Sequence, residues 1–539
     1  MHTVQWQALQ AHLRAHHLEL ADDPKKYRKV LALNAMKRGS VAIESHALAF
    51  VPLPSVRAEI CNYCFKRATR ATPLQRCSRC QSAYYCSKHC FQKAWFAAHQ
   101  YVCKANQPSA TQEDQDKMDE LMLERVILSI ARAKNDITHN AADLALGAHL
   151  EAFSSLLAHE TKQPQDQLDR FKHIATAVIQ KPHIKSLGID AAALLIYLCR
   201  FRSNNFGIID NQLFPIGEGT YPIGSLFNHS CRPNAVALYN GTSQIIRLID
   251  DVEEGEEITL AYIDVANSRK TRQQMLRDKY FFECECTRCS SDHGFGLVDQ
   301  LLGEPSEEED VYVEGGETFL KKTLMEQVES WNVLELTKRY PPGSDATVSP
   351  GFIMDIPRYV HFMGTFMFPS VANRSLRADG LLEAPKEVYE QLLFNAAAAA
   401  TSYPLLDETE HGGGVLKPYS LKTLTVATRL LNEQMAKNRW PQSSRLAMLV
   451  LTHYMFIYPR NHPMLALHFL TVAKAAWNAL VQLEVAGINR KLEKEYERGV
   501  SRWIHLAKST LSCNFGEQGE HWREIVELEW IFNRDQKLK

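Results

Sequence analysis

A ladder of closely spaced cysteines constrains this chain more than any other feature of its sequence. The ladder runs from residue 61 to residue 103 and consists of Cys61, Cys64, Cys77, Cys80, Cys86, Cys90, His99 and Cys103. Two thiolates separated by two residues can hold one metal ion from a tight turn, and eight such ligands suffice for two tetrahedral zinc ions. We therefore predict a structural zinc module in which every metal position is filled. An iron–sulfur centre is the weaker alternative, because the closing histidine suits zinc.

A second cysteine cluster lies far downstream and needs one more ligand. It comprises Cys284, Cys286 and Cys289, and Cys231 is available as the fourth member. The remaining cysteines, Cys199 and Cys513, lie in apolar stretches that are typical of buried thiols. This usage fits a reducing compartment, where paired cysteines indicate metal rather than disulfides.

Charge and hydropathy narrow the class of protein. The net charge of −1 over 539 residues gives no global field that would attract nucleic acid or membrane. The zinc module itself is basic, with eight Lys or Arg and no Asp or Glu between residues 61 and 104. We favour solvated charge that offsets the thiolates over a dedicated acidic partner or a nucleic-acid site. The first 20 residues lack a secretory signal pattern, and the longest apolar run, Ala191 to Cys199, is too short to span a bilayer.

Periodicity divides the rest of the chain. Residues 1–23 predict an amphipathic helix, residues 28–51 are strand-rich, and residues 113–200 are helical. Short β runs are expected at 235–239, 244–249 and 257–262, followed by a basic helix at 269–281. An acidic linker is expected at 303–317 and a loop at 403–418. Further helices, which suggest an array of hairpins, are expected at 317–338, 385–402, 419–437, 443–457, 463–484, 489–512 and 520–533.

Three ordered motifs carry a specific resemblance. The zinc module, from Ala83-Tyr84-Tyr85-Cys86 through His99 to Cys103, resembles the MYND finger. The heptad Asn228-His229-Ser230-Cys231-Arg232-Pro233-Asn234 and the segment ending at Tyr262 resemble the SET domain. Residues 277–286 resemble the post-SET segment, so the chain resembles the SET and MYND family of protein-lysine methyltransferases.

The resemblance implies an α+β fold: a β-rich SET domain interrupted by a MYND finger and a helical insert, then an all-α TPR-like domain. The implied parts are 24–57 (SET N-terminal part), 58–104 (MYND), 105–200 (helical insert), 201–265 (SET core), 266–292 (post-SET) and 317–539 (C-terminal helical domain). One zinc is implied at Cys61, Cys64, Cys86 and Cys90, the second at Cys77, Cys80, His99 and Cys103, and the third at Cys231, Cys284, Cys286 and Cys289.

The implied activity is methyl transfer from S-adenosylmethionine to protein lysine, histone or non-histone. Tyr262 and Tyr280 would flank the target lysine as catalytic residues. The cofactor pocket would be lined by Arg28, Asn204, Asn228, His229, Tyr262 and Phe282. Methyl transfer from a sulfonium needs alignment more than a strong base, and an aromatic channel can hold methylated ammonium. The MYND finger would recruit proline-rich peptides, and we expect a monomer in the nucleus, the cytoplasm or both.

The sequence also departs from the family pattern. The cofactor loop of the family reads Gly-Xaa-Gly, whereas this chain has Tyr27-Arg28-Lys29. Gly207 and Ala261 replace a commoner Thr and a commoner Ser or Cys. Because glycine lets backbone approach a ligand, its loss keeps a second hypothesis open: a catalytically weak adaptor acting through peptide binding. Direct nucleic-acid binding through the basic finger is a third.

Overall fold

The computed structural model describes residues 6–103, 115–135, 141–290, 294–303, 321–322, 324–326, 329, 385–401 and 420–539. The chain divides into two compact units. The N-terminal unit comprises Met1–His229, Pro233–Leu260 and Leu276–Phe282, and the C-terminal unit comprises Ser230–Arg232, Ala261–Met275 and Glu283–Lys539. The division passes through the predicted SET core and the post-SET segment, and the six predicted domains stay predictions.

The N-terminal unit begins with a helix and a hairpin, which corrects one prediction. Helix α1 (Gln7–Ala15) ends eight residues before the predicted helix would, and β1 (Leu18–Asp23) pairs antiparallel with β2 (Tyr27–Ala32). His17 has a φ of 58°, a left-handed conformation that stops the helix. Leucines occur on both sides of His17, so the apolar pattern predicted one continuous helix. Residues 18–23 instead form a strand because they pair with β2.

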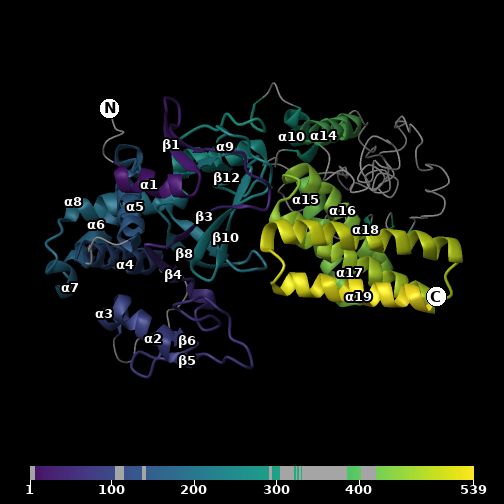
Figure 1. The fold of residues 1–539 in the computed structure, drawn as a ribbon, viewed down its shortest axis with the longest axis horizontal. Helices are drawn as coiled ribbons and strands as arrows, with labels where there is room; N and C mark the ends of the chain where they lie inside the picture. Colours follow the sequence, from purple (N-terminus) through teal and green to yellow (C-terminus); the bar gives the residue numbers. More distant parts are fainter. Residues whose placement is uncertain are drawn as a thin grey trace. The chain divides into compact units, whose positions relative to one another are not determined.

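Small sheets form the centre of the N-terminal unit (Figure 1). One has the order β10-β11-β3 and the other β4-β8-β7, while β9 pairs in parallel with β12. The bounds are β3 (Val41–His46), β4 (Ala49–Pro52), β7 (Phe206–Ile209), β8 (Pro215–Thr220), β9 (Asn228–His229), β10 (Ala235–Asn240), β11 (Ser243–Leu248) and β12 (Thr259–Leu260). The predicted β runs are confirmed, except that the last is shorter and ends at Leu260. A buried cluster that includes Ile43, Phe227 and Ile246 forms the core beneath these strands.

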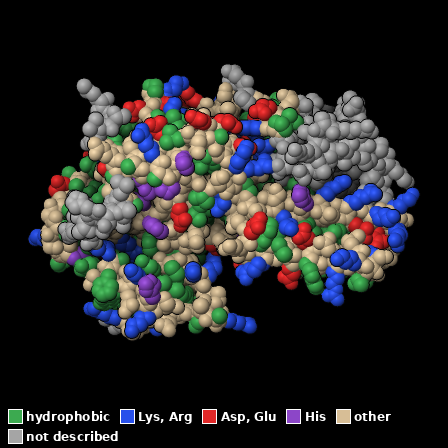
Figure 2. Space-filling view, in the orientation of Figure 1, with side chains coloured by type: hydrophobic (Ala, Val, Ile, Leu, Met, Phe, Trp, Pro, Cys, Tyr) green, Lys and Arg blue, Asp and Glu red, His purple; other side chains and the backbone are tan. Residues whose placement is uncertain are grey.

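Helices cover the remainder of this unit. The predicted helical stretch 113–200 is confirmed by α4 (Gln115–Asn135), α5 (Ala141–Ser155), α6 (Gln165–Ile179), α7 (Pro182–Lys185) and α8 (Ala191–Asn204). Val126, Ile127 and Leu198 are fully buried in one shared core. The cysteine-rich segment folds as β5 (Gln75–Arg76), β6 (Tyr84–Tyr85), α2 (Lys88–Ala94), a π-helical turn (Trp95–His99) and α3 (Gln100–Val102). Figure 2 shows Lys and Arg side chains around this segment, in keeping with its basic sequence.

The C-terminal unit is helical, and with the sheets above it confirms the predicted α+β fold. The basic helix predicted at 269–281 is α9 (Arg269–Tyr280), whose last turn belongs to the N-terminal unit. The others are α10 (Phe295–Leu302), α14 (Lys386–Thr401), α15 (Leu421–Ala436), α16 (Trp440–Ile457), α17 (Pro463–Val485), α18 (Arg490–Phe515) and α19 (Glu520–Leu538). From α15 to α19 each helix packs against the next, as Figure 1 shows for α16 to α19. The predicted linker 303–317, helix 317–338 and loop 403–418 fall almost entirely outside the described residues.

Helix α17 has the length and apolar composition of a membrane span, although no uninterrupted apolar run marked it in the sequence. Its most apolar window is 61% buried inside the protein. Leu465, Phe469 and Leu480 are fully buried against neighbouring helices. That burial is what a central helix of a packed array requires, so its apolar surface is explained by the core of this unit.

Candidate active site and metal clusters

The cysteine-rich segment brings its eight ligand residues together as two separate groups of four. Cys61, Cys64, Cys86 and Cys90 form the first, and Cys77, Cys80, His99 and Cys103 form the second. Within each group all ligand atoms lie within 4.8 Å of one another. Neighbouring atoms are closer: Sγ of Cys64 lies 3.6 Å from Sγ of Cys86, and Sγ of Cys77 lies 3.8 Å from Sγ of Cys103. Tetrahedral zinc–thiolate geometry requires a separation of about 3.8 Å, so both groups fit zinc.

Local structure explains how these ligands are held. Ser87 caps the N-terminus of α2, and its hydroxyl accepts a hydrogen bond of 3.1 Å from the backbone N–H of Cys90. His99 ends the π-helical turn, where its ring packs edge-on against Tyr85 and Trp95. Burial, and secondarily the charge of Arg125, lowers the pKa of His99 to about 4. The imidazole is therefore neutral at physiological pH, the form that binds a metal.

A third group of four ligands forms in the C-terminal unit. Cys231 joins Cys284, Cys286 and Cys289, with all sulfur atoms within 4.8 Å of one another and 3.5 Å between Sγ of Cys231 and Sγ of Cys289. Gln273 of α9 holds this segment through both ends of its amide. Its Nε2 donates to the carbonyl of Cys284 at 2.8 Å, and its Oε1 accepts from the backbone N–H of the same residue at 2.9 Å. These four soft ligands also fit tetrahedral zinc.

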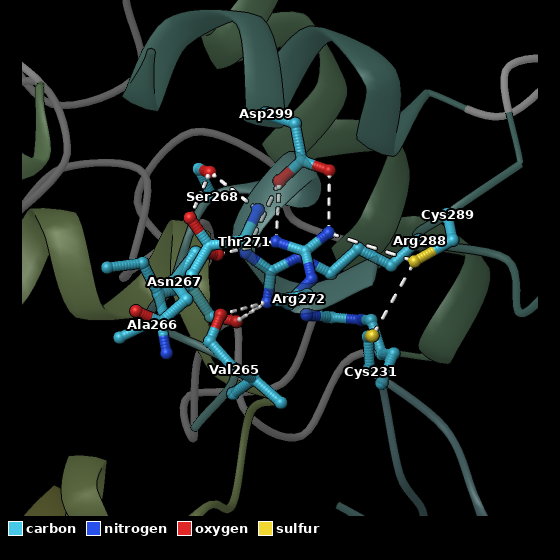
Figure 3. A network of polar contacts seen from close by, with 12 residues as sticks. Cys231, Val265, Ala266, Asn267, Ser268, Thr271, Arg272, Arg288, Cys289 and Asp299 are labelled. Carbon is cyan, nitrogen blue, oxygen red and sulfur yellow. Dashed lines mark hydrogen bonds and ion pairs between the residues drawn. The ribbon is translucent and has the colours of Figure 1, made fainter. Parts of the chain in front are cut away.

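Two fully buried arginines lie beside this third group (Figure 3). Arg272 donates to both carboxylate oxygens of Asp299, at 3.1 and 2.8 Å, and its Nη2 lies 3.9 Å from Sγ of Cys289. Arg288 contacts the same carboxylate at 3.5 Å. Burial opposes the charged form of Arg272, but the hydrogen bonds that it donates to Asp299 outweigh this effect and raise the pKa of Arg272. Sequence reasoning missed these arginines; the one available signal was the position of Arg288 next to Cys289.

The heptad is fastened to β12 by its last residue. Oδ1 of Asn234 accepts a hydrogen bond of 2.8 Å from the backbone N–H of Thr259, and its Nδ2 donates to the carbonyl of Glu257 at 2.9 Å. In the parallel pairing, Thr259 lies opposite Asn228 and Leu260 lies opposite His229. The heptad is therefore held against β12 both by backbone pairing and by the side chain of Asn234.

Hydrogen bonds link three of the predicted cofactor residues. Asn228 donates to the carbonyl of Arg28, and also to Glu257 at 2.8 Å. The guanidinium of Arg28 donates to the carbonyl of Ser225 at 3.4 Å, and the hydroxyl of Ser225 donates to the carbonyl of Asn204 at 2.9 Å. Arg28 is thus bonded directly to Asn228, 200 positions away, and is joined to Asn204 through Ser225, which sequence reasoning did not single out.

Asn204 and Asn228 use their side-chain amides in the same way. Both hydrogens on Nδ2 of Asn204 go to backbone carbonyls, of Leu157 at 3.2 Å and of Arg200 at 2.8 Å. The amide of Asn228 is also fully used as a donor. Among the described residues, neither Oδ1 accepts a hydrogen bond. These oxygens suit a ligand that brings N–H donors, such as the ammonium and adenine groups of S-adenosylmethionine.

The aromatic residues of the predicted pocket lie around the end of α9. The ring of His229 lies 6.1 Å from that of Phe282, centroid to centroid. Burial raises the pKa of Tyr280 to about 12, so its phenol stays protonated at neutral pH. Phe281, between Tyr280 and Phe282 in the sequence, has a φ of 62°, a left-handed conformation that non-glycine residues rarely adopt. Such backbone strain persists only where the surrounding structure holds the residue in place, and strained residues are common at functional sites.

Tyr262 departs from its predicted setting. It lies on a bend two residues beyond β12, whereas the sequence predicted a strand that carries it. Pairing stops at Leu260 because the partner strand, β9, has only two residues. Tyr262 is half-buried and belongs to the C-terminal unit.

The predicted cofactor loop has a glycine-like backbone conformation at Tyr27, although it lacks the glycine. Tyr27, at the first glycine position, has a φ of 71°, and 57% of its side chain surface is exposed. The neighbouring backbone is pinned, because Asp23 accepts hydrogen bonds from the N–H groups of Lys25 and Lys26 at 2.9 and 2.8 Å. Lys29, at the second glycine position, pairs with Asp23 at 3.5 Å. Neither the ring of Tyr27 nor the ammonium group of Lys29 is buried in the protein core.

Comparison with known proteins agrees with these observations. Residues 61–103 match the MYND finger family. The chain is 24% identical to the histone-lysine N-methyltransferase ASHR1 of Arabidopsis thaliana, over 87% of this chain and 88% of that protein. It is 29% identical to human histone-lysine N-methyltransferase SMYD3 over 52% of this chain, and 30% identical to human N-lysine methyltransferase SMYD2 over 51%. These last two matches span 62% and 60% of the relatives' own lengths.

The MYND match covers the two interleaved ligand groups, and the similarity to the lysine methyltransferases extends well beyond the finger. Along the chain the finger follows β4, and the heptad, strands β10 to β12 and the cysteine trio come after it. The chain thus carries a MYND finger and is similar to lysine methyltransferases that include SMYD2 and SMYD3.

Proposed function

We propose that this protein transfers a methyl group from S-adenosylmethionine to the side-chain amine of protein lysine. The observation that carries the proposal is the linked group of Arg28, Asn204 and Asn228, whose two open Oδ1 acceptors face no protein donor among the described residues. The printed names of the relatives, as histone-lysine or N-lysine methyltransferases, support the same reaction class.

The cofactor supplies a methyl group that is already activated on a sulfonium, so the protein has to bind, orient and exclude water. Asn204 and Asn228 would accept hydrogen bonds from the cofactor, while the ring of Phe282 beside His229 offers an apolar surface. Tyr280 would keep its proton and orient the incoming amine through its hydroxyl. The family resemblance also implies a catalytic role for Tyr262, and an aromatic ring beside the target lysine gives methylated ammonium a cation–π contact.

The metal ions would have structural roles. Zinc at the two groups of the finger would hold its fold, and a third zinc at Cys231, Cys284, Cys286 and Cys289 would fix the segment that follows Phe282. All ligand positions come from protein, so none of the three would offer an open site for substrate. The finger would serve to recruit partners, with proline-rich peptides as the class that the family resemblance implies.

The test is calorimetric titration of S-adenosylmethionine into zinc-loaded protein, followed by methyl transfer to a lysine peptide array. Asn228→Ala should weaken cofactor binding by about tenfold or more, because it removes an acceptor and frees the carbonyl of Arg28. Tyr262→Phe should leave binding unchanged and lower transfer by about 10² or more. Asn240→Ala, exposed at the end of β10, is the matched control and should change neither.

One observation favours the second candidate, an adaptor with little catalysis. Tyr27 and Lys29 occupy the places of both glycines in the cofactor loop. No binding of S-adenosylmethionine up to millimolar concentration would reject methyl transfer and favour the adaptor. Micromolar binding with transfer that depends on Tyr262 would reject the adaptor.

A further inference from the structure

Three arginines extend from the third cysteine group to the helices of the C-terminal unit. Arg232 directly follows Cys231, Arg288 directly precedes Cys289, and Arg272 approaches the sulfur of Cys289 at 3.9 Å. The side chains of Arg272 and Arg288 have no exposed surface, and that of Arg232 is 8% exposed. Arginines are rarely buried this completely unless each is paired, so their partners define what this region does.

The charges around the group do not balance without a metal-bound thiolate cluster. Arg272 and Arg288 share the single carboxylate of Asp299, and among the described residues no other acidic group pairs with either. One buried positive charge therefore remains. Four thiolates around one Zn²⁺ carry a net charge of −2, whereas four protonated thiols carry none. The loaded cluster supplies the negative charge that the two guanidiniums lack.

Arg288 and Arg232 contact the C-terminal end of α16. Nη1 of Arg288 donates to the carbonyl of Ile457, the last residue of that helix, at 2.9 Å, and Nη1 of Arg232 donates to the carbonyl of Tyr458 at 3.4 Å. The final carbonyls of a helix have no partner within it, and cations are favourable at this end of the helix dipole. Two residues adjacent in sequence to cysteine ligands thus cap one helix.

Arg232 reaches two further helices. Its guanidinium lies over the ring of Phe295 in α10, 4.5 Å from the centroid, and its Nε lies 3.5 Å from the carboxylate of Glu390 in α14. Phe295 in turn packs edge-on against Phe394 of α14, 4.8 Å between centroids. The ligand-bearing loops, α10, α14 and the end of α16 are therefore connected through three side chains.

We propose that the third zinc cluster is the electrostatic anchor of the C-terminal helices, and that metal binding and the packing of α10, α14 and α16 are one coupled equilibrium. The loaded cluster neutralises Arg272 and Arg288, which lets both stay buried and hold the helices. Loss of the metal leaves those charges uncompensated and loosens the helix ends that they cap. By linkage, disturbing the arginines weakens metal binding to the same extent. The inference stands whether or not the chain transfers methyl groups.

The forward test compares two cysteine variants of the full chain. Cys286→Ser removes a ligand of the third group, and Cys64→Ser, also half-buried, removes a ligand of the finger. Zinc content is measured by mass spectrometry and backbone protection by hydrogen exchange. We expect three zinc ions in the unaltered chain. With Cys286→Ser, exchange at the end of α16 and in α10 should rise about tenfold or more, whereas Cys64→Ser should leave these helices unchanged. The amides of β10 and β11 report whether the N-terminal unit stays folded.

The reverse test begins from the arginine. Arg288→Met should lower the affinity of the third site for zinc about tenfold or more, measured by competition with a chromogenic chelator, while the two finger sites retain theirs. Arg288→Lys, which keeps the charge, should recover part of that loss. Unchanged protection of α16 in Cys286→Ser with the third zinc absent would overturn the proposal, as would equal zinc affinity in Arg288→Met, or an unaltered chain that holds zinc in the finger alone. Methyl transfer is not a readout in either test, so failure of the proposed function would not alter these outcomes.

Discussion

The finger and the third cysteine group use the same chemistry in two different ways. All eight finger ligands lie between residues 61 and 103, and the buried cluster around them consists of the ligands and nearby residues of that segment, such as Tyr85 and Ala94. The third group needs Cys231 from more than 50 residues before Cys284, and its neighbours are buried arginines that reach distant helices. The first is a local module, and the second is part of the tertiary structure.

This difference teaches where metal loss should be felt. A module whose buried core consists mainly of the metal ligands depends on zinc for its own folding. Loss of its zinc should have little effect on the rest of the protein. A group surrounded by paired charges depends on zinc and on each pair, because breaking a buried pair leaves an uncompensated charge. Loss of a finger ligand should therefore unfold a local segment, whereas loss of a buried charge should destabilise distant helices.

The largest effect should follow removal of a finger ligand. Cys80→Ser should release the zinc of the second finger group and unfold the segment, because structural zinc contributes about 10 kcal/mol or more to folding such modules. Hydrogen exchange should increase throughout residues 61–103 and stay unchanged in β10 and β11. Cys513→Ser, a half-buried thiol outside the groups, is the control. Loss of protection across the whole N-terminal unit would show that the finger is not a local module.

Removal of a buried charge should come next. Arg272→Met leaves Asp299 without its bidentate partner and should destabilise the C-terminal unit by about 3–5 kcal/mol. Chemical denaturation followed by circular dichroism measures the change. Arg269→Met, three residues earlier on α9 and half-buried, should stay within about 0.5 kcal/mol of the unaltered chain. Equal effects of the two variants would contradict a special role for the buried network.

Acidification should destabilise the helical array. Burial lowers the pKa of His468 to about 4, against an ordinary value of 6.5, while its Nε2 donates to the carbonyl of Ala447 at 2.7 Å. The unfolded chain therefore binds more protons between these two values, so stability falls as pH drops from about 6.5 to about 4, with a slope of about 1.4 kcal/mol per pH unit. His468→Gln keeps an N–H donor and should flatten the slope by that amount, measured by urea denaturation across the range. An unchanged slope would exclude His468 as the source.

The smallest effect concerns backbone strain. Tyr27→Gly removes a left-handed tyrosine and should stabilise the N-terminal unit by about 1 kcal/mol, partly offset by the flexibility of glycine in the unfolded chain. Asn438, with a φ of 55° in the C-terminal unit, offers the matched comparison. Asn438→Gly should gain less, because asparagine tolerates this conformation. Thermal unfolding measures both, and a larger gain at Asn438 would contradict the argument.

Local patterns predicted most of the elements and the ligands. Regular cysteine spacing identified the finger, and apolar periodicity placed α14 to α19 to within about three residues at nearly every end, because both signals are written in consecutive residues. The exception at the N-terminus, where Leu18 begins a strand, arose because the choice between helix and strand depended on pairing with β2. The same reason explains Tyr262, whose predicted strand ends where its two-residue partner ends.

The sequence by itself determined which residues are the candidate metal ligands and which family motifs the chain carries, since spacing, order and residue type are properties of the linear chain. Tertiary structure alone decided that Ser225 joins Arg28 to Asn204, and that Asp299 is shared by two buried arginines. Those partners come from segments with no common spacing, and they meet because burial makes an unpaired polar group costly. What the sequence could not specify is therefore the set of polar contacts that connect its motifs.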